Sequence, residues 1–174
     1  MYKEVALLVV FIVAAVGCYG LTFLAAEFGL RTGIVDKPRP GEVQSWIVPR
    51  TGGYAIFAAF LIASLVGAYL IPRSDAESWR LVGAMLGAAA ILPIALADDR
   101  HRLAPLPQLL GQIAVACVPM AFGILADSIA TPFWGTIYFP LAIAIPFTAF
   151  WIVGMINTMN LVDVMDGLAS GIAA

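Results

Sequence analysis

The sequence predicts an all-α, multi-pass integral membrane protein, and three observations support this fold class. Hydrophobic residues make up 62% of the chain, whereas a soluble domain typically contains roughly 45–50%. Charged residues make up only 11%, less than half of the roughly 25% that is usual in soluble proteins. The hydrophobic residues are also concentrated in blocks comparable in length to the roughly 20 apolar residues that a helix needs to cross a bilayer.

Five of these blocks are interpreted as complete transmembrane helices, and a sixth begins near the end of the chain. The first block is too long for a removable signal peptide and lacks a small-residue cleavage site, so we expect it to be a true span. The sixth opens near Leu168 and stops at Ala174, which predicts a domain truncated at its C-terminus. The complete spans are expected at Val5–Glu27, Tyr54–Ile71, Leu81–Leu96, Leu109–Leu125 and Ile137–Ile156.

The loops between these spans differ in their basic residues, and cytoplasmic loops are enriched in Lys and Arg. The loop after the first span carries four basic residues, and the loop after the third carries Arg100 and Arg102. The loop after the second carries Arg73 and Arg80, offset by two acids, and the loop after the fourth carries no basic residue. We therefore expect the N-terminus outside the cell, with the odd-numbered loops and the segment after the fifth span in the cytoplasm.

The remaining composition excludes other classes of protein. A net charge of -2 is too small to indicate a nucleic-acid partner. Cys18 and Cys117 both fall inside expected spans, where an apolar packing role suits them, so no disulfide framework is expected.

The polar residues that are uncommon beside apolar spans lie in the three expected cytoplasmic segments. The first, residues 33–53 (GIVDKPRPGEVQSWIVPRTGG), contains three prolines and four glycines, which exclude a regular helix. The two glycines that end it allow the backbone to come close to a neighbour or a ligand. The alternative is a solvated connector that only follows the enrichment of cytoplasmic loops in basic residues.

The second segment, residues 95–112 (ALADDRHRLAPLPQLLGQ), contains Asp98 and Asp99 at the end of an apolar span. Like charges this close need a cation nearby, or one carboxylate holds its proton. The pair therefore fits a magnesium or proton-handling site. The alternative is two solvated acids beyond the helix end, where the helix dipole disfavours them. His101, the only histidine of the chain, is interpreted as a solvated residue outside the site.

The third segment, INTMNLVDVMDGLASG, places two asparagines and two aspartates directly after an apolar span. Such residues at a bilayer edge are costly and favour a functional interpretation. On one helix, Asn160, Asp163 and Asp166 would spread over about 120°, with Asn157 about 180° from Asp166. One straight helix cannot aim all four inward, so we expect Asn157 to belong to the end of the fifth span and the aspartates to the start of the sixth. Two acids also suit a helix N-terminus by charge alone, but this alternative does not explain the asparagines.

Together these segments resemble the polyprenyl-phosphate N-acetylhexosamine-1-phosphate transferase family, the multi-span enzymes that begin bacterial peptidoglycan, O-antigen and teichoic-acid lipid intermediates. The resemblance is carried, in order, by GIVDKP with PRTGG, by ADDRHRL with LLGQ, and by NTMNLVDVMDGLASG, which is similar to the family's NxxNxxDGxDGLA motif. It covers nearly the whole chain. The resemblance implies that residues 1–174 are the N-terminal portion of a single transmembrane transferase domain.

The family resemblance implies an enzyme of the bacterial cytoplasmic (inner) membrane whose active site faces the cytoplasm. In that family, polyprenyl phosphate attacks the β-phosphate of a UDP-N-acetylhexosamine, UMP leaves, and a polyprenyl-diphosphate sugar remains in the membrane. Mg²⁺ is the implied cofactor, with Mn²⁺ as the alternative, because a divalent cation offsets the repulsion between two anionic reactants. The implied partners are a UDP-amino sugar, polyprenyl phosphate and the membrane, with a homodimer left open.

The resemblance also implies roles for individual residues. Asp98 and Asp99 match the family's aspartate pair and are expected to be catalytic, and together with Asp163 they are the expected metal ligands. A phosphate monoester is already largely dianionic at neutral pH, with a second pKa of about 6, so direct attack is favoured over a covalent aspartyl-phosphate. The residues expected to bind substrate are Asn157, Asn160, Asp163, Asp166, Gly167, Lys37, Arg39 and Arg50.

The chain also departs from the family pattern. Residues 41–44 read GEVQ where many relatives have RKxH, Gln108 replaces a common lysine, and Val164 replaces a glycine of the motif. The family's later GDxGS motif and His-rich loop would lie beyond Ala174, so the 174-residue polypeptide alone is expected to be inactive.

The first loop favours one sugar over another. VPRTGG and GIVDKP are more similar to the N-acetylglucosamine and O-antigen (lipopolysaccharide) branches than to phospho-N-acetylmuramoyl-pentapeptide transferase, which is the alternative. UDP-N-acetylglucosamine or a related amino sugar is therefore the expected donor.

Two other classes of membrane protein are alternatives to a transferase. A transporter also uses acids and amides near broken helices, but its site lies near the bilayer midplane, where no expected span has an ionisable residue. A non-catalytic scaffold would be consistent with the departures in the first loop and at Val164.

Overall fold

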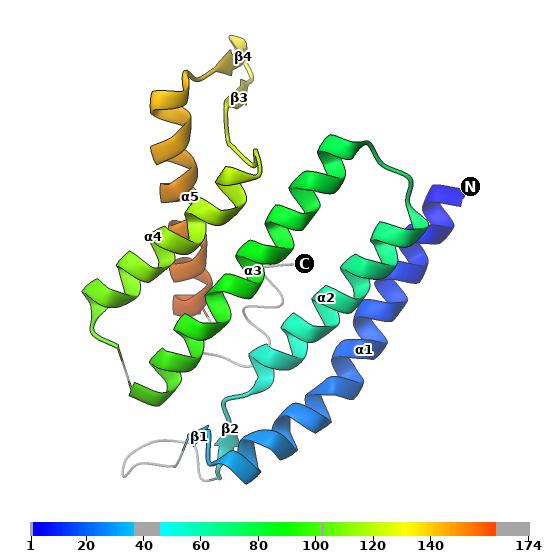
Figure 1. Ribbon diagram of the computed structural model, residues 1–174, viewed down its shortest axis with the longest axis vertical. Helices are drawn as coiled ribbons and strands as arrows, with labels where there is room; N and C mark the ends of the chain where they lie inside the picture. The colour runs from blue at the N-terminus through cyan, green and yellow to red at the C-terminus, as the bar shows by residue number, and fades with distance from the viewer. Residues whose placement is uncertain (1, 37–45, 102, 163–174) are drawn as a thin grey trace. The chain divides into compact units, whose positions relative to one another are not determined.

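The computed structural model describes residues 2–36, 46–101 and 103–162, which form five helices and two short β-hairpins (Figure 1). The expected all-α, multi-pass class is confirmed, with the hairpins as small additions. Four of the helices are long and apolar enough to cross a membrane, and α4 is a shorter apolar helix. The elements are α1 (Tyr2–Thr32), β1 (Val35–Asp36), β2 (Val48–Pro49), α2 (Gly52–Leu70), α3 (Asp75–His101), α4 (Pro105–Ala121), β3 (Ser128–Thr131), β4 (Gly135–Tyr138) and α5 (Leu141–Val162).

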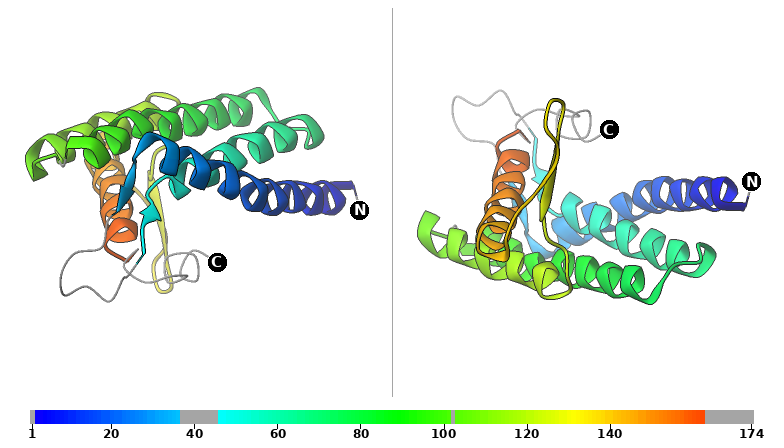
Figure 2. Two further views of the ribbon diagram at one scale, coloured as in Figure 1. Left: turned by 90° about the horizontal axis from the view of Figure 1, so that it is seen from below. Right: turned by 90° about the horizontal axis from the view of Figure 1, so that it is seen from above.

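The chain divides into two compact units, residues 1–78 and 79–174. In the first unit, α1 and α2 lie side by side (Figures 1 and 2). The buried face of α2 is a stripe of small residues at every fourth position, from Ala55 to Gly67. Without large side chains between them, the two backbones can approach closely, which is how many transmembrane helices associate. A Cβ added at Gly67 would lie 3.3 Å from Cγ2 of Val10 on α1.

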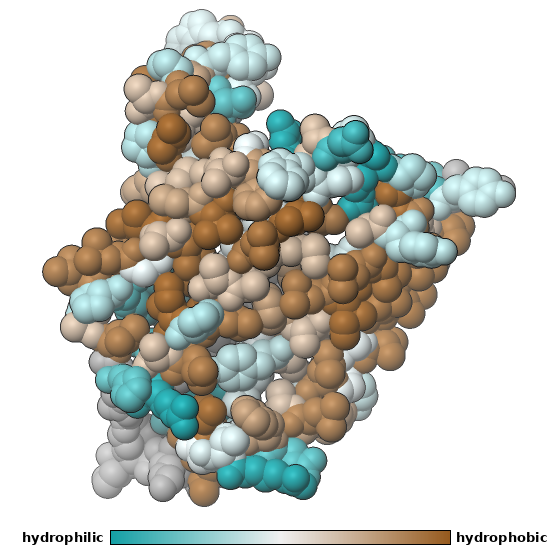
Figure 3. Space-filling view, in the orientation of Figure 1, coloured by the Kyte–Doolittle hydropathy of each residue, from teal (hydrophilic) through white to brown (hydrophobic). Residues whose placement is uncertain are grey.

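Large apolar side chains cover the outward surfaces of these helices. Phe11 is 69% exposed and Ile56 is 62% exposed, and the brown colour of Figure 3 shows that apolar residues dominate the visible helical surface. Such a surface is costly in water and suits the hydrocarbon core of a bilayer.

The first loop is fixed at both ends by a small antiparallel hairpin, in which Val35 pairs with Pro49 and Asp36 with Val48. Thr51, which follows it, is fully buried and donates its hydroxyl hydrogen to the carbonyl oxygen of Ala25 in α1. The ends of the Pro- and Gly-rich loop are therefore shaped, as the sequence predicts.

In the second unit, glycines again mark the close contacts. A Cβ at Gly83 of α3 would lie 2.2 Å from Cβ of Phe122, and one at Gly87 would lie 3.0 Å from Cδ of Pro119. Thr148 of α5 donates to the carbonyl of Ala144 and accepts a hydrogen bond from the amide of Ala126. Because Thr148 is only 4% exposed, these bonds fix the connection after α4 against α5.

The fourth expected span is wrong at both ends, because α4 covers 17 residues from Pro105 to Ala121 and not Leu109–Leu125. Pro105 suits the first turn, where its missing N–H needs no partner. The helix stops where Gly123 adopts a positive φ of 80°. The amides of Gly123 and Ile124 then donate to the carbonyls of Met120 and Pro119, which closes the last turn in a Schellman motif.

The fifth expected span begins at Ile137, but α5 begins at Leu141, and residues 135–138 form β4. The β-branched and aromatic residues Thr136, Ile137 and Tyr138 suit a strand, and Pro140 disfavours helical backbone at the residue before it. The carbonyl of Pro140 then accepts the first helical hydrogen bonds. The expected sixth span lies outside the described residues.

Candidate active site

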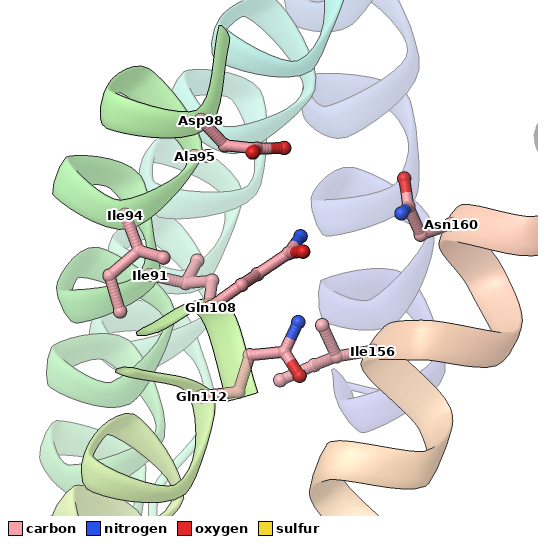
Figure 4. A pocket seen from close by; sticks show the side chains of 8 residues that line it. All are labelled: Ile91, Ile94, Ala95, Asp98, Gln108, Gln112, Ile156 and Asn160. Atoms are coloured by element: carbon pink, nitrogen blue, oxygen red, sulfur yellow. The ribbon is translucent and has the colours of Figure 1, made fainter. Parts of the chain in front are cut away.

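A pocket of about 200 Å³ lies in the second unit, lined by residues of α3, α4 and α5 (Figure 4). The carboxylate of Asp98 points into it from α3, and the amides of Gln108 and Gln112 reach into it from α4 (Figure 4). Asn160 faces them from α5. The lining residues are Ile91, Ile94, Ala95, Asp98, Gln108, Gln112, Ile156 and Asn160.

The structure places Asp98 inside α3, one turn before its end at His101, and half-buried. It is therefore not a solvated acid beyond the helix end. One carboxylate oxygen, Oδ1, accepts a hydrogen bond from the backbone amide of Leu103 at 2.9 Å. This bond ties the turn after α3 to the pocket and fixes the direction of the carboxylate. Asp99 is the next residue of α3, and its side chain lies outside the described part of the structure.

Asn157 and Asn160 both belong to α5, which confirms that Asn157 lies at the end of the fifth span, although inside the helix. Asn157 forms a reciprocal amide pair with Gln112 of α4. Its Nδ2 donates to Oε1 of Gln112 at 2.6 Å, and Nε2 of Gln112 donates to Oδ1 of Asn157 at 3.4 Å. Nδ2 of Asn157 also donates to the carbonyl of Val153 at 2.8 Å. Asn157 thus holds α5 against α4, while Asn160, one turn later, lines the pocket.

We expect the amide pair to contribute measurably to stability. In a double-mutant cycle, the coupling energy between Gln112→Leu and Asn157→Leu should be about 0.5–2 kcal/mol, the range seen for hydrogen bonds between transmembrane helices. The free energy of unfolding of each variant, measured in mixed micelles, gives the coupling energy. Gln108→Leu is the matched control, since it changes the same residue type one turn away, and its coupling to Asn157→Leu should be near zero. Additive effects of the Gln112 and Asn157 variants would show that the pair is not formed.

The other expected site residues are not all placed. Arg50 is exposed and follows β2 in the first unit, where its backbone amide donates to the carbonyl of Ile34 at 3.1 Å. The expected site residues that lie outside the described part of the chain are Lys37, Arg39, Asp163, Asp166 and Gly167.

The donors that the pocket offers are oxygen atoms of one carboxylate and several amides. Hard cations such as Mg²⁺ prefer such oxygen ligands, and Mg²⁺ commonly takes only one or two carboxylates beside waters and substrate phosphates. Asp98 therefore fits the expected cation. Within the described ranges, no three His, Cys, Asp or Glu residues lie together as a metal-binding group, and Asp163 lies outside those ranges.

Sequence reasoning did not nominate Gln108 and Gln112 as site residues. The available signal was their spacing, because they are two amides four positions apart in an otherwise apolar helix, PLPQLLGQIAVACVPMA. Residues at i and i+4 lie on one helix face. Two amides in that arrangement in a membrane helix predict a polar partner on a neighbouring helix.

The known proteins that the chain is similar to carry names of one kind of enzyme. Over 172 residues the chain is 31% identical to "Probable undecaprenyl-phosphate N-acetylglucosaminyl 1-phosphate transferase" of Bacillus subtilis (strain 168), with 98% of this chain and 46% of that protein aligned. It is 33% identical over 174 residues to "Decaprenyl-phosphate N-acetylglucosaminephosphotransferase" of Mycobacterium tuberculosis (strain CDC 1551 / Oshkosh), covering 98% of this chain and 43% of that protein. The chain therefore spans less than half the length of these curated relatives.

A more distant relative is "Undecaprenyl-phosphate alpha-N-acetylglucosaminyl 1-phosphate transferase" of Escherichia coli (strain K12). It is 28% identical over 154 residues, which cover 87% of this chain and 40% of that protein. No solved structure matches the chain.

The family model described as "Glycosyl transferase family 4" matches residues 81–174. This region is more than half of the chain and contains every residue that lines the pocket. The resemblance carried by the sequence motifs is thereby confirmed, and the chain belongs to glycosyl transferase family 4.

Proposed function

We propose that the full-length protein transfers N-acetylhexosamine-1-phosphate from a UDP-sugar to polyprenyl phosphate and releases UMP. The observation that carries this proposal is the pocket beside the end of α3, where Asp98, Asn160 and two glutamines meet within the region that matches the family. The relatives are named as undecaprenyl-phosphate or decaprenyl-phosphate transferases, which supports an enzyme over a transporter or a scaffold. Their names also specify N-acetylglucosamine, which supports this sugar over the muramoyl-pentapeptide alternative.

The residues of the pocket suit a reaction between two phosphate-bearing substrates. In the proposed step, an oxygen of the lipid phosphate forms a bond to the β-phosphorus of the nucleotide sugar, and the bond to the UMP oxygen breaks. The amide N–H groups of Asn160 and Gln108 can donate to phosphate, ribose or uracil oxygens. Asp98, fixed by Leu103, would hold Mg²⁺, which supplies positive charge against the charge that develops on the leaving UMP.

The proposed setting is the bacterial cytoplasmic membrane, with the pocket on the cytoplasmic side. The basic residues at Arg100 and Arg102, next to the pocket end of α3, support this orientation because cytoplasmic loops favour Lys and Arg. A nucleotide sugar made in the cytoplasm would then reach the pocket without crossing the bilayer.

The proposal predicts magnesium-dependent release of UMP. Purified full-length protein should release UMP from UDP-N-acetylglucosamine only when polyprenyl phosphate and Mg²⁺ are both present. Removal of the cation with EDTA should stop the reaction, and added Mg²⁺ or Mn²⁺ should restore it. Chromatography of the nucleotide products measures the reaction, and omission of the lipid controls for hydrolysis. Absence of UMP with every UDP-amino sugar tested would refute the proposed activity.

A further inference from the structure

The hairpin between α4 and α5 presents aromatic side chains on a rigid support. β3 and β4 pair in antiparallel register from Ser128 with Tyr138 to Thr131 with Gly135. At the tip, the hydroxyl of Thr131 donates to the carbonyl of Gly135 at 2.8 Å and accepts from the amide of Trp134 at 3.1 Å. Figures 1 and 2 show the hairpin beyond the first turn of α5, which is the end opposite to Asn160.

Three aromatic residues of this hairpin are almost uncovered. Phe133 is 87% exposed, Trp134 is 80% exposed and Tyr138 is 75% exposed. The rings of Phe133 and Trp134 meet edge to face, with 6.4 Å between their centroids. The tip therefore offers a preformed aromatic surface.

The hairpin also lacks the charged residues that hold a loop in water. Residues 128–162 contain no Asp, Glu, Lys, Arg or His. The connection between α2 and α3, expected on the same side of the membrane, is different, because Arg73, Asp75, Glu77 and Arg80 lie in or next to it. The connection between α4 and α5 has one charged residue, the exposed Asp127 that precedes β3, and therefore favours water less than the connection between α2 and α3.

The length of α4 brings the hairpin close to the lipid. With 17 residues at about 1.5 Å each, α4 is shorter than the roughly 30 Å hydrocarbon core of a bilayer. The chain would therefore leave α4 near the edge of the apolar layer. Backbone groups at that depth need partners within the protein, and the ladder of β3 and β4 supplies them.

We propose that the β3–β4 hairpin is a membrane-interface anchor, with Phe133 and Trp134 lying among the lipid head groups of the leaflet at the Leu141 end of α5. Trp and Tyr, whose rings carry a polar N–H or O–H group on an apolar body, concentrate at this depth in membrane proteins. Trp134 and Tyr138 are of this kind, and Phe133 adds apolar surface beside Trp134. The anchor would fix the depth of α4 and α5, the two helices that carry Gln108 and Asn160 to the pocket. It does not depend on the proposed transferase activity.

The depth of a spin label attached to the hairpin tests this proposal. Thr136 is exposed and next to the tip, so Thr136→Cys reports on the hairpin while keeping both aromatic residues. The label is placed on full-length protein with its other cysteines replaced, reconstituted in phosphatidylcholine and phosphatidylglycerol vesicles. Collision rates with oxygen, which enters lipid, and with a water-soluble nickel chelate give the depth. Ala76→Cys, at an exposed position in the charged first turn of α3, serves as the water reference. Phe150→Cys, at an exposed position within α5, serves as the hydrocarbon reference.

We expect the label at Thr136 to lie between the two references, close to the head groups. Adding Phe133→Ser and Trp134→Ser should raise the accessibility of this label to the nickel chelate several-fold. If that variant fails to fold, the depth of the Thr136 label in protein that keeps both aromatic residues, compared with the two references, still tests the proposal. A label as accessible to the chelate as the one at Ala76 would overturn the proposal. Protection from both oxygen and the chelate would overturn it as well, because it would show that a protein surface covers the hairpin.

Discussion

Asp98→Asn should abolish UMP release by the full-length protein, with a loss of roughly 100-fold or more, since even outer partners of a metal site are worth about 10–100-fold. Asparagine has the same shape and can still accept the hydrogen bond from Leu103, so the turn after α3 should survive. What disappears is the negative charge in the pocket. The loss should therefore appear in kcat, while the thermal unfolding of the protein changes little.

The matched control is Asp127→Asn, which removes an exposed carboxylate of the same unit that does not line the pocket. This variant should retain full activity. The same substitution at Asp99 and Asp163 tests the other expected metal ligands. Unchanged turnover in Asp98→Asn would remove Asp98 from the site, whatever the outcome at the other two positions.

Gly29→Ala should destabilise the first unit by about 1–3 kcal/mol, the usual cost of overpacking a well-packed contact. A Cβ at position 29 would lie 2.6 Å from Oγ1 of Thr51 and 2.9 Å from Cβ of Pro49. Neither atom can move away easily, because Thr51 is fully buried and bonded to Ala25, and Pro49 is held in β2 opposite Val35. The clash would separate α1 from the base of the first loop.

Gly20→Ala provides the matched control in the same helix, since a Cβ there meets no atom within 4 Å. It should leave stability unchanged or raise it slightly, because alanine is the better helix former. Thermal unfolding of the two purified variants in detergent, followed by circular dichroism, measures the difference. Equal stability of Gly29→Ala and Gly20→Ala would contradict the close contact between α1 and Thr51.

The sequence was sufficient to predict the helices because long apolar blocks leave few alternatives in a membrane. The sequence was misleading at the start of the fifth span. There the block TIYFPLAIAIPF runs from β4 into α5, and its strand residues are as apolar as its helix residues. Composition carries no signal for that boundary. The positions of Gly123, Gly135 and Pro140 do carry one, since two adopt positive φ and the third restricts the residue before it.

Part of the site could be predicted from residue type alone. A carboxylate such as Asp98 is conspicuous at the end of an apolar span, and so is an amide such as Asn160. The pairing of Gln112 with Asn157 could not be predicted in the same way, because the two are 45 residues apart. It depends on how α4 and α5 are rotated and shifted against each other, and that geometry results from packing along their whole length.

The amide pair of Gln112 and Asn157 also bears on how the protein enters the membrane during synthesis. Each amide alone would be costly in lipid, and each satisfies the other only when α4 and α5 lie against each other. The connection between them is closed by its own hydrogen bonds. The two helices therefore suit insertion together, as one helix–loop–helix unit. The amides of Gln112 and Asn157 would then be hydrogen-bonded to each other before either helix is surrounded by lipid.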